Sequence, residues 1–104
     1  MISKVTRFPK KDASRFLSRV TDEKAFRCND SCVMFDLREL ARALDNMSEE
    51  TFRYHANDQK NDFANWVADV IGDQELASNL RKAADKQQTH EMVSNRVSFL
   101  SRKA

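Results

Sequence analysis

The fold is decided by a stretch in the second half of the chain, which reads NDFANWVADVIGDQELA from Asn61 to Ala77. Five large apolar residues in it recur at intervals of three and four positions: Phe63, Trp66, Val67, Val70 and Ile71. This spacing is typical of a helix with one buried face. Gly72, the single glycine of the chain, predicts the end of that helix in a left-handed conformation. Asp73 then predicts the cap of a following helix, so the chain must change direction sharply here.

The preceding stretch predicts two further helices, over 36–46 and 48–56. Asp36 and Glu39 form a pair like a capping box, and Ser48 is a favourable N-cap followed by two glutamates. Four residues of the first helix make its apolar stripe: Leu37, Leu40, Ala41 and Leu44. Both helices therefore begin with a recognisable start signal and bury one face.

Residues 12–20 predict a short helix with Asp12 as its cap. Its apolar face is made by Ala13, Phe16, Leu17 and Val20. The basic residues before it, together with Pro9, predict an extended lead-in over 1–11, because proline disfavours helix at the residue before it.

Residues 25–35 change from helical to alternating periodicity and predict a β-hairpin. Phe26 and Cys28 alternate on the first strand, and Val33 and Phe35 alternate on the second. The Asn-Asp-Ser cluster at 29–31 has turn chemistry between them. A helix is the alternative, and this cluster weakens it.

The C-terminal part, 74–102, contains neither glycine nor proline and has a helical apolar rhythm. One unbroken helix of this length would span about 42 Å at 1.5 Å per residue. A domain of this size is only about 26 Å across. The helix therefore either breaks near 85–89 or projects. A projecting end would expose a partner interface made of Met92, Val93, Val97, Phe99 and Leu100, whereas the alternative is that it folds back on the N-terminal helix.

These patterns predict a mainly α fold, a small bundle of about five helices with one short hairpin near residues 25–35. One glycine and one proline in 104 residues argue against an all-β fold. The domain organisation is a basic lead-in over 1–11 and a single helical domain over 12–104, in which 85–104 is the segment that would project or oligomerise. The predicted core consists of Leu40, Leu44, Phe52, Phe63, Trp66, Val67, Val70, Leu76 and Leu80.

Compartment and metal content follow from the cysteines and the N-terminus. The N-terminus has no apolar run typical of a secretory signal, and no segment is apolar enough to span a membrane, so we expect a cytoplasmic protein. Free thiols at Cys28 and Cys32 are the favoured state, and a cross-strand disulfide stays open. Zinc is disfavoured because His55 and His90 are too far apart in sequence. We expect no cofactor.

The charge is unevenly distributed although the net charge is only +2. Residues 1–35 and 76–104 each carry a net charge of +4, whereas 36–75 carries −6. Clustered cations can neutralise phosphates, so the basic ends are candidates for nucleic-acid contacts, and the alternative is a solvated surface. The candidate residues are Lys4, Arg7, Lys10, Lys11, Arg81, Lys82, Lys86, Arg96, Arg102 and Lys103.

The order of several short motifs is similar to that of a family of small microbial helical domains of unknown function. In that family an F-x-x-H segment precedes N-D-F-x-x-W-x-x-x-V-x-G-D-x-x-L-A. Here the two motifs are Phe52–His55 and Asn61–Ala77, and the resemblance covers about residues 26–80. It implies a helical fold, and it implies no activity, cofactor or catalytic residue.

Four residues in this region form the candidate pocket: Tyr54, His55, Asp62 and Trp66. A histidine with a carboxylate could act as an acid–base pair, with the tryptophan as a stacking wall. The alternative, which we favour, is structural, because a tryptophan in the middle of an apolar stripe is usually core.

We therefore predict a small non-enzymatic intracellular protein with an interaction or structural role, in an oligomer or a larger assembly. Its partner would be itself or another protein, with no membrane association. The alternative is a protein that associates with nucleic acid or nucleoprotein through its basic ends. An enzyme acting through His55 is the third candidate.

Overall fold

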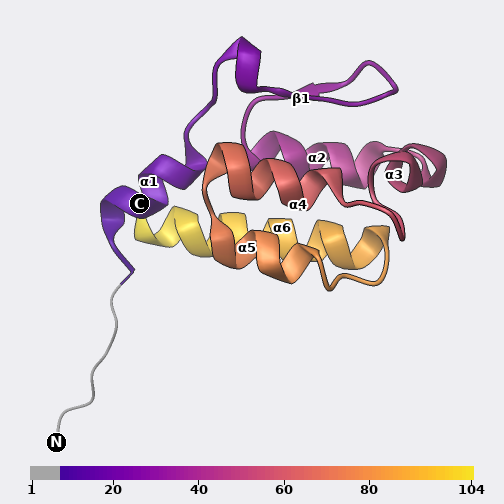
Figure 1. Cartoon of the computed structure of the whole chain (residues 1–104). Helices are drawn as coiled ribbons and strands as arrows, with labels where there is room; N and C mark the ends of the chain where they lie inside the picture. Colours follow the sequence, from indigo (N-terminus) through magenta and orange to yellow (C-terminus); the bar gives the residue numbers. More distant parts are fainter. Residues whose placement is uncertain (1–7) are drawn as a thin grey trace, which may run out of the picture.

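A computed structural model describes residues 8–104 of the chain. Within this range the chain is mainly helical and carries one two-stranded hairpin, as predicted (Figure 1). The α-helices are α1 (Lys10–Leu17), α2 (Leu37–Asn46), α3 (Glu49–His55), α4 (Asp62–Trp66), α5 (Gln74–Leu80) and α6 (Lys86–Lys103). The strands are β1 (Phe26–Arg27) and β2 (Val33–Met34), and two shorter helical segments are η1 (Asp22–Lys24) and η2 (Val67–Ile71).

The first helix begins earlier and ends earlier than the sequence predicts. Pro9 and not Asp12 occupies the N-cap, and its carbonyl accepts the N–H groups of Asp12 and Ala13. Proline suits this position because it has no N–H to leave unpaired. Val20 lies outside the helix, since its N–H donates to the carbonyl of Phe35 at 2.8 Å. The lead-in predicted over 1–11 thus falls partly in α1 and, for residues 1–7, outside the described residues.

The hairpin forms where it was predicted, but its second strand faces the other way. Phe26 pairs with Met34 and Arg27 with Val33, so Met34 shares the buried face of Phe26. Met34 is 1% exposed, whereas Val33 and Phe35 are half-buried. Alternation along 33–35 could not reveal this, because the register of the pair determines which face each residue takes.

The helix starts predicted at Asp36, Ser48 and Asp73 are confirmed, and Asn61 caps α4 in the same way. The side chains of Asp36, Ser48, Asn61 and Asp73 each accept an N–H from the first turn of α2, α3, α4 and α5. Gly72 has φ of 91° and donates its N–H to the carbonyl of Val67 at 2.7 Å, which closes the single π-turn of η2. The chain reverses at this glycine, and α5 runs back beside α4 (Figure 1).

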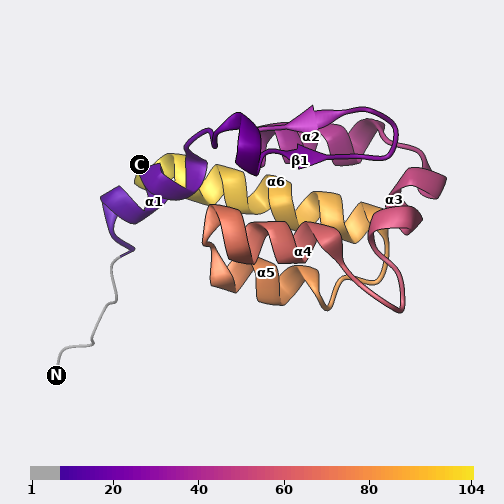
Figure 2. The same ribbon diagram turned by 45° about the horizontal axis from the view of Figure 1, so that its top comes forward.

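The C-terminal region is two helices and not one. α5 ends at Leu80, and Asp85 caps α6, so the break lies just before the predicted 85–89 region. α6 packs along α1, α2 and α5, and in both views it lies within the helical body (Figures 1 and 2). Of the two arrangements open from the sequence, the projecting end is wrong. The helix folds back because its own Val93 and Leu100 are core residues, both fully buried.

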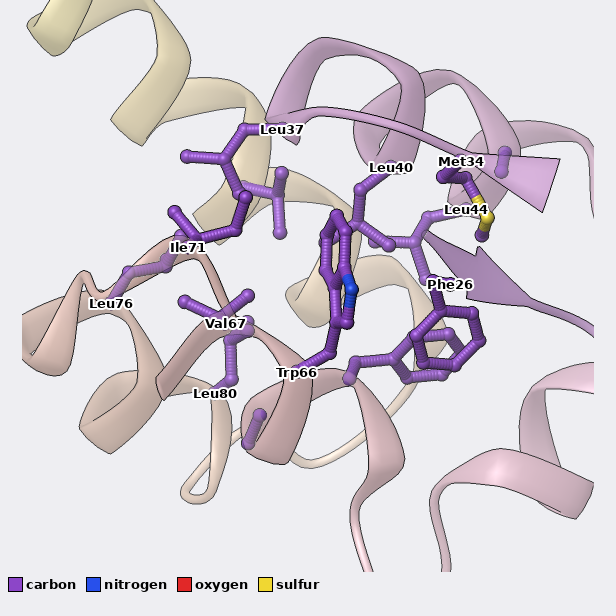
Figure 3. Packing of buried hydrophobic residues seen from close by; sticks show 14 of the residues in the cluster. Phe26, Met34, Leu37, Leu40, Leu44, Trp66, Val67, Ile71, Leu76 and Leu80 are labelled. Carbon is purple, nitrogen blue, oxygen red and sulfur yellow. The ribbon is translucent and has the colours of Figure 1, made fainter. Parts of the chain in front are cut away.

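The core lies between the hairpin, α2, the α4–η2–α5 reversal and α6 (Figure 3). All nine predicted core residues belong to it or pack on it, and only Val70 is half-buried. Phe26, Met34, Phe16 and Ile71 add to the set predicted from sequence. Among the described residues no helix is both long and apolar enough to cross a membrane.

Candidate binding groove and the predicted site residues

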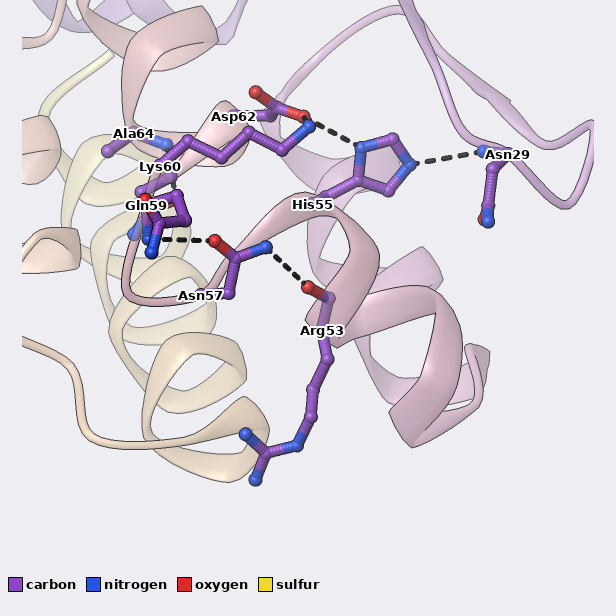
Figure 4. Close-up of polar contacts among 9 residues, drawn as sticks. Asn29, Arg53, His55, Asn57, Gln59, Lys60, Asp62 and Ala64 are labelled. Atoms are coloured by element: carbon purple, nitrogen blue, oxygen red, sulfur yellow. Dashed lines mark hydrogen bonds and ion pairs between the residues drawn. The ribbon is translucent and has the colours of Figure 1, made fainter.

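His55, at the end of α3, is 5% exposed and hydrogen-bonded on both ring nitrogens (Figure 4). Its Nε2 accepts the backbone N–H of Asn29 at 3.1 Å, and its Nδ1 lies 3.0 Å from an oxygen of Asp62. A backbone N–H can only donate, so Nε2 carries no proton and the proton lies on Nδ1. His55 therefore fastens the hairpin turn to the start of α4 as a neutral imidazole.

Asp62 has a second partner in the ammonium group of Lys60, 2.9 Å away. Burial raises the pKa of the Asp62 carboxyl, but the hydrogen bonds from His55 and Lys60 outweigh it, and the net pKa is lowered. The carboxylate thus stays ionised and accepts both hydrogen bonds.

The four residues of the predicted pocket are divided between a packed aromatic cluster and the surface. The His55 ring is in contact with the rings of Phe26, Phe63 and Tyr54 at centroid distances of 4.8–5.6 Å. Trp66 lies beyond Phe26, where its indole N–H donates to the Lys24 carbonyl at 2.7 Å. Tyr54 is exposed, with Lys60 over its ring at 4.9 Å. The structural alternative therefore accounts for every polar atom of His55 and Trp66.

The predicted partner interface on α6 is divided between core and surface. Val93 and Leu100 are fully buried against the rest of the chain. Met92, Val97 and Phe99 are half-buried, and Phe8 packs edge-on against Phe99 at 5.3 Å. The five residues do not form one free apolar face, because a helix presents residues seven apart to the same side, here the core side.

The predicted nucleic-acid contacts are also dispersed. Lys4 and Arg7 lie outside the described residues. Lys10, Lys11, Arg102 and Lys103 are exposed at one end of α6, and Arg81 and Lys82 are exposed near the other. Lys86 donates to the carbonyl of Leu44 at 3.0 Å.

Arg96 is not a surface cation. It holds Asp73 with two hydrogen bonds of 2.7 and 2.8 Å, and the carboxylate is 1% exposed. Burial lowers the pKa of Arg96. The hydrogen bond and charge of Asp73, together with the charge of Glu75, outweigh burial, so the net pKa is raised. Its guanidinium also lies 5.3 Å from the ring centroids of Phe8 and Phe99. Arg96 therefore has a structural role, since the Asp73 carboxylate already compensates its charge.

The structure contains a groove that the sequence did not suggest. It lies between β2 and α2 and has a volume of about 370 Å³. Its apolar lining comes from Met34, Ala43 and Met47, which are buried, with Val33 and Phe35 beside them. The polar rim consists of Arg19, Asp30, Cys32, Glu39, Arg42 and Asn46. We call this hollow the β2–α2 groove.

A small residue lines the groove on the side of α2. Ala43 sits on the buried face of α2, between Leu40 and Leu44, and opposite the second strand. The predicted stripe contained Ala41, whereas the structure buries Ala43 and leaves Ala41 half-buried. The register of the hairpin, which decides what faces Ala43, was not visible in the sequence.

Both cysteines are free thiols. Cys28 is buried, and burial, followed by the charges of Asp30 and Cys32, raises its pKa to about 12. Cys32 is exposed at the rim of the groove. No group of three or more potential metal ligands occurs in residues 8–104.

Comparisons with protein-family models, with curated proteins and with solved structures found no match for this chain. The resemblance to small microbial domains of unknown function stays a prediction.

Proposed function

We propose that the protein acts by binding another protein, or a second copy of itself, and that it is not an enzyme. The observation that carries this proposal is the β2–α2 groove, an apolar hollow with a polar rim on one face of the domain. Binding sites are typically concave, mostly apolar and supplied with a few polar groups that orient the ligand. Catalysis by His55 has less support, because both of its ring nitrogens are engaged within the fold.

The role that follows is that of an intracellular interaction or structural protein, in an oligomer or a larger assembly. The free thiols of Cys28 and Cys32 are in keeping with a reducing, cytoplasmic location.

A charge reversal at the groove tests this proposal. Arg42→Glu changes the rim of the groove, and Lys82→Glu makes the same change in charge at an exposed position beyond α5. We expect proteins captured by the wild-type chain, or its own oligomers in light scattering, to be lost with Arg42→Glu and kept with Lys82→Glu. Equal binding by both variants would contradict a role for the groove.

Nucleic-acid association is the second candidate, and one observation favours it. Phe8 packs on Phe99, and the Lys103 ammonium lies 5.6 Å from the same ring. The start of α1 and the end of α6 therefore meet, which gathers four exposed cations at one end of the molecule: Lys10, Lys11, Arg102 and Lys103. Gel shifts across a salt series test this. The logarithm of the binding constant should fall with the logarithm of salt concentration, with a slope near −0.9 for each phosphate neutralised. Absence of binding at low salt would exclude it.

A further inference from the structure

The outer edge of β2 offers a backbone position ready to pair with another strand. The N–H of Cys28 donates to the carbonyl of Cys32, which makes these two a hydrogen-bonded pair. Such pairs alternate with non-bonded pairs along an antiparallel ladder, so Arg27 and Val33 form a non-bonded pair. The N–H and C=O of Val33 therefore point away from β1. Neither group has a partner within residues 8–104.

The neighbouring edge positions are already used. The N–H of Phe35 donates to Glu39 at 2.8 Å, and its carbonyl accepts from Val20. At the other end, the N–H of Ser31 closes the turn onto Cys28. Val33 is thus a single open position, and it borders the β2–α2 groove.

The charges around the groove indicate what its ligand carries. Arg19 holds Glu39 at 2.8 Å and lies 3.7 Å from Asp36, so these two carboxylates are compensated. Arg42 is exposed one helical turn beyond Glu39, and its charge helps to lower the pKa of the Glu39 carboxyl. Within the described part of the chain Arg42 has no ion pair of its own, and Asp30 is the remaining carboxylate of the rim. An acidic side chain on the ligand would complement this cation.

We propose that the β2–α2 groove binds an extended peptide of a partner protein, which adds as a third strand on Val33, inserts two apolar side chains two residues apart into the groove and places an acidic side chain near Arg42. This rests on the proposed function and specifies its partner. A strand that pairs with Val33 directs alternate side chains to the face of α2, whichever way it runs. A volume of about 370 Å³ suits two side chains of moderate size.

A symmetric probe peptide makes the test independent of strand direction: acetyl-Glu-Thr-Val-Thr-Val-Thr-Glu-amide. Its central threonine would pair with Val33, and its two valines and terminal glutamates would face α2. We expect the peptide to shift the amide signals of the groove residues in NMR spectra. It should also slow hydrogen exchange at the Val33 amide about ten-fold at saturation and protect Cys32 from alkylation. No shift at millimolar peptide would overturn the proposal.

Two matched controls separate strand addition from simple occupation of the groove. Val33→Pro removes the outward N–H without removing a bond of the hairpin, and we expect it to weaken the peptide about three- to ten-fold. Arg27→Pro removes the outward N–H on the edge away from the groove, together with the guanidinium contacts to Asp22, and should leave affinity unchanged. N-methylation of the central threonine repeats the test on the wild-type protein.

The outcomes distinguish this proposal from the function on which it rests. Equal binding of the normal and N-methylated peptides, with no slowing at Val33, would overturn strand addition and leave the groove as a binding site. Partner binding that is unchanged in Arg42→Glu would instead contradict the proposed function. A dimer that depends on Val33 and excludes the peptide would assign the edge to a second copy of the chain and overturn the peptide as its occupant.

Discussion

Two turns of the chain, at Gly72 and at Ser31 in the hairpin, each combine a residue of positive φ with a nearby polar pair. We call them the Gly72 corner and the hairpin corner, and they differ in how far water is excluded. At the Gly72 corner, Gly72 has φ of 91° and Asp73 follows it. The Asp73 carboxylate is 1% exposed, caps α5 and is held by both arms of Arg96. The charge is fully removed from water, and only a cationic partner with two donors balances it.

At the hairpin corner the equivalent residues are less deeply buried. Ser31 has φ of 76°, and His55 links Asn29, two residues before it, to Asp62. The Asp62 side chain is 30% exposed. A neutral imidazole and one lysine suffice there, because water still solvates part of the carboxylate. Both carboxylates have a cationic partner, but the buried one receives two hydrogen bonds from Arg96 whereas the partly exposed one receives a single bond from Lys60. Solvent access therefore goes with how closely the cation holds the carboxylate.

Breaking the ion pair at the Gly72 corner should have the largest effect. Arg96→Met keeps much of the packing but leaves the Asp73 carboxylate buried and unpaired. We expect a loss of about 3–5 kcal/mol in the free energy of unfolding, measured by urea denaturation. The double variant Asp73→Asn/Arg96→Met should recover part of it, because no charge is then buried alone. A loss below about 1 kcal/mol in the single variant would contradict this interpretation.

Removing the imidazole at the hairpin corner should cost less. His55→Ala leaves a cavity among Phe26, Phe63 and Tyr54 and takes one partner from Asn29 and one from Asp62. We expect a loss of about 2–3 kcal/mol, measured in the same denaturation experiment. Tyr54→Ala, at an exposed neighbour, is the control and should change stability by much less. Equal losses would show that the buried polar link contributes little.

The two corners also differ in how much of them the sequence could predict. Gly72, Asp73 and the caps of α2 and α3 act on residues three to five positions away, so local patterns identified them correctly. Arg96 pairs with Asp73 across 23 positions, and charge counting placed it among the nucleic-acid contacts. His55 was singled out, but whether its nitrogens were free depended on the distant Asn29.

The same limit applies to the larger elements. The break before α6 has no glycine or proline to mark it, and it follows from the packing of Val93 and Leu100 onto the core. The β2–α2 groove depends on which face Met34 takes, and a two-residue strand has too little periodicity to fix its register. Local signals therefore predicted the elements, whereas the candidate site arises from their assembly.

The two residues of positive φ, Gly72 and Ser31, should respond to substitution in opposite ways. A Cβ on Gly72 would meet its nearest heavy atom, on Arg15, at 3.5 Å, so space is not the obstacle. The obstacle is the backbone conformation, because φ of 91° is costly for a residue with a Cβ. We expect Gly72→Ala to destabilise the protein by about 1–2 kcal/mol in thermal unfolding. Unchanged stability would mean that the corner relaxes without cost.

At Ser31 the opposite substitution should help. Ser31 has φ of 76° in the hairpin turn, where glycine has no steric penalty. Ser31→Gly is therefore expected to stabilise the protein by about 0.5–1 kcal/mol, less than the penalty at Gly72 because glycine also gains freedom in the unfolded chain. Ser14→Gly, at an exposed position inside α1, is the control and should destabilise. A loss of stability in Ser31→Gly would refute strain at the turn.

The smallest effect concerns pH and separates the corners by solvent access. The folded-state pKa of Asp62 is lowered, so its contribution to stability is fully present above the ordinary carboxyl pKa and is lost as pH falls through the folded-state value. Because the side chain is partly exposed, this contribution should be under about 1 kcal/mol. Asp62→Asn should therefore lower stability slightly at pH 7 and flatten its fall below about pH 4, measured by urea denaturation across pH. An acid limb as steep as that of the wild type would show that Asp62 is not the carboxylate that titrates.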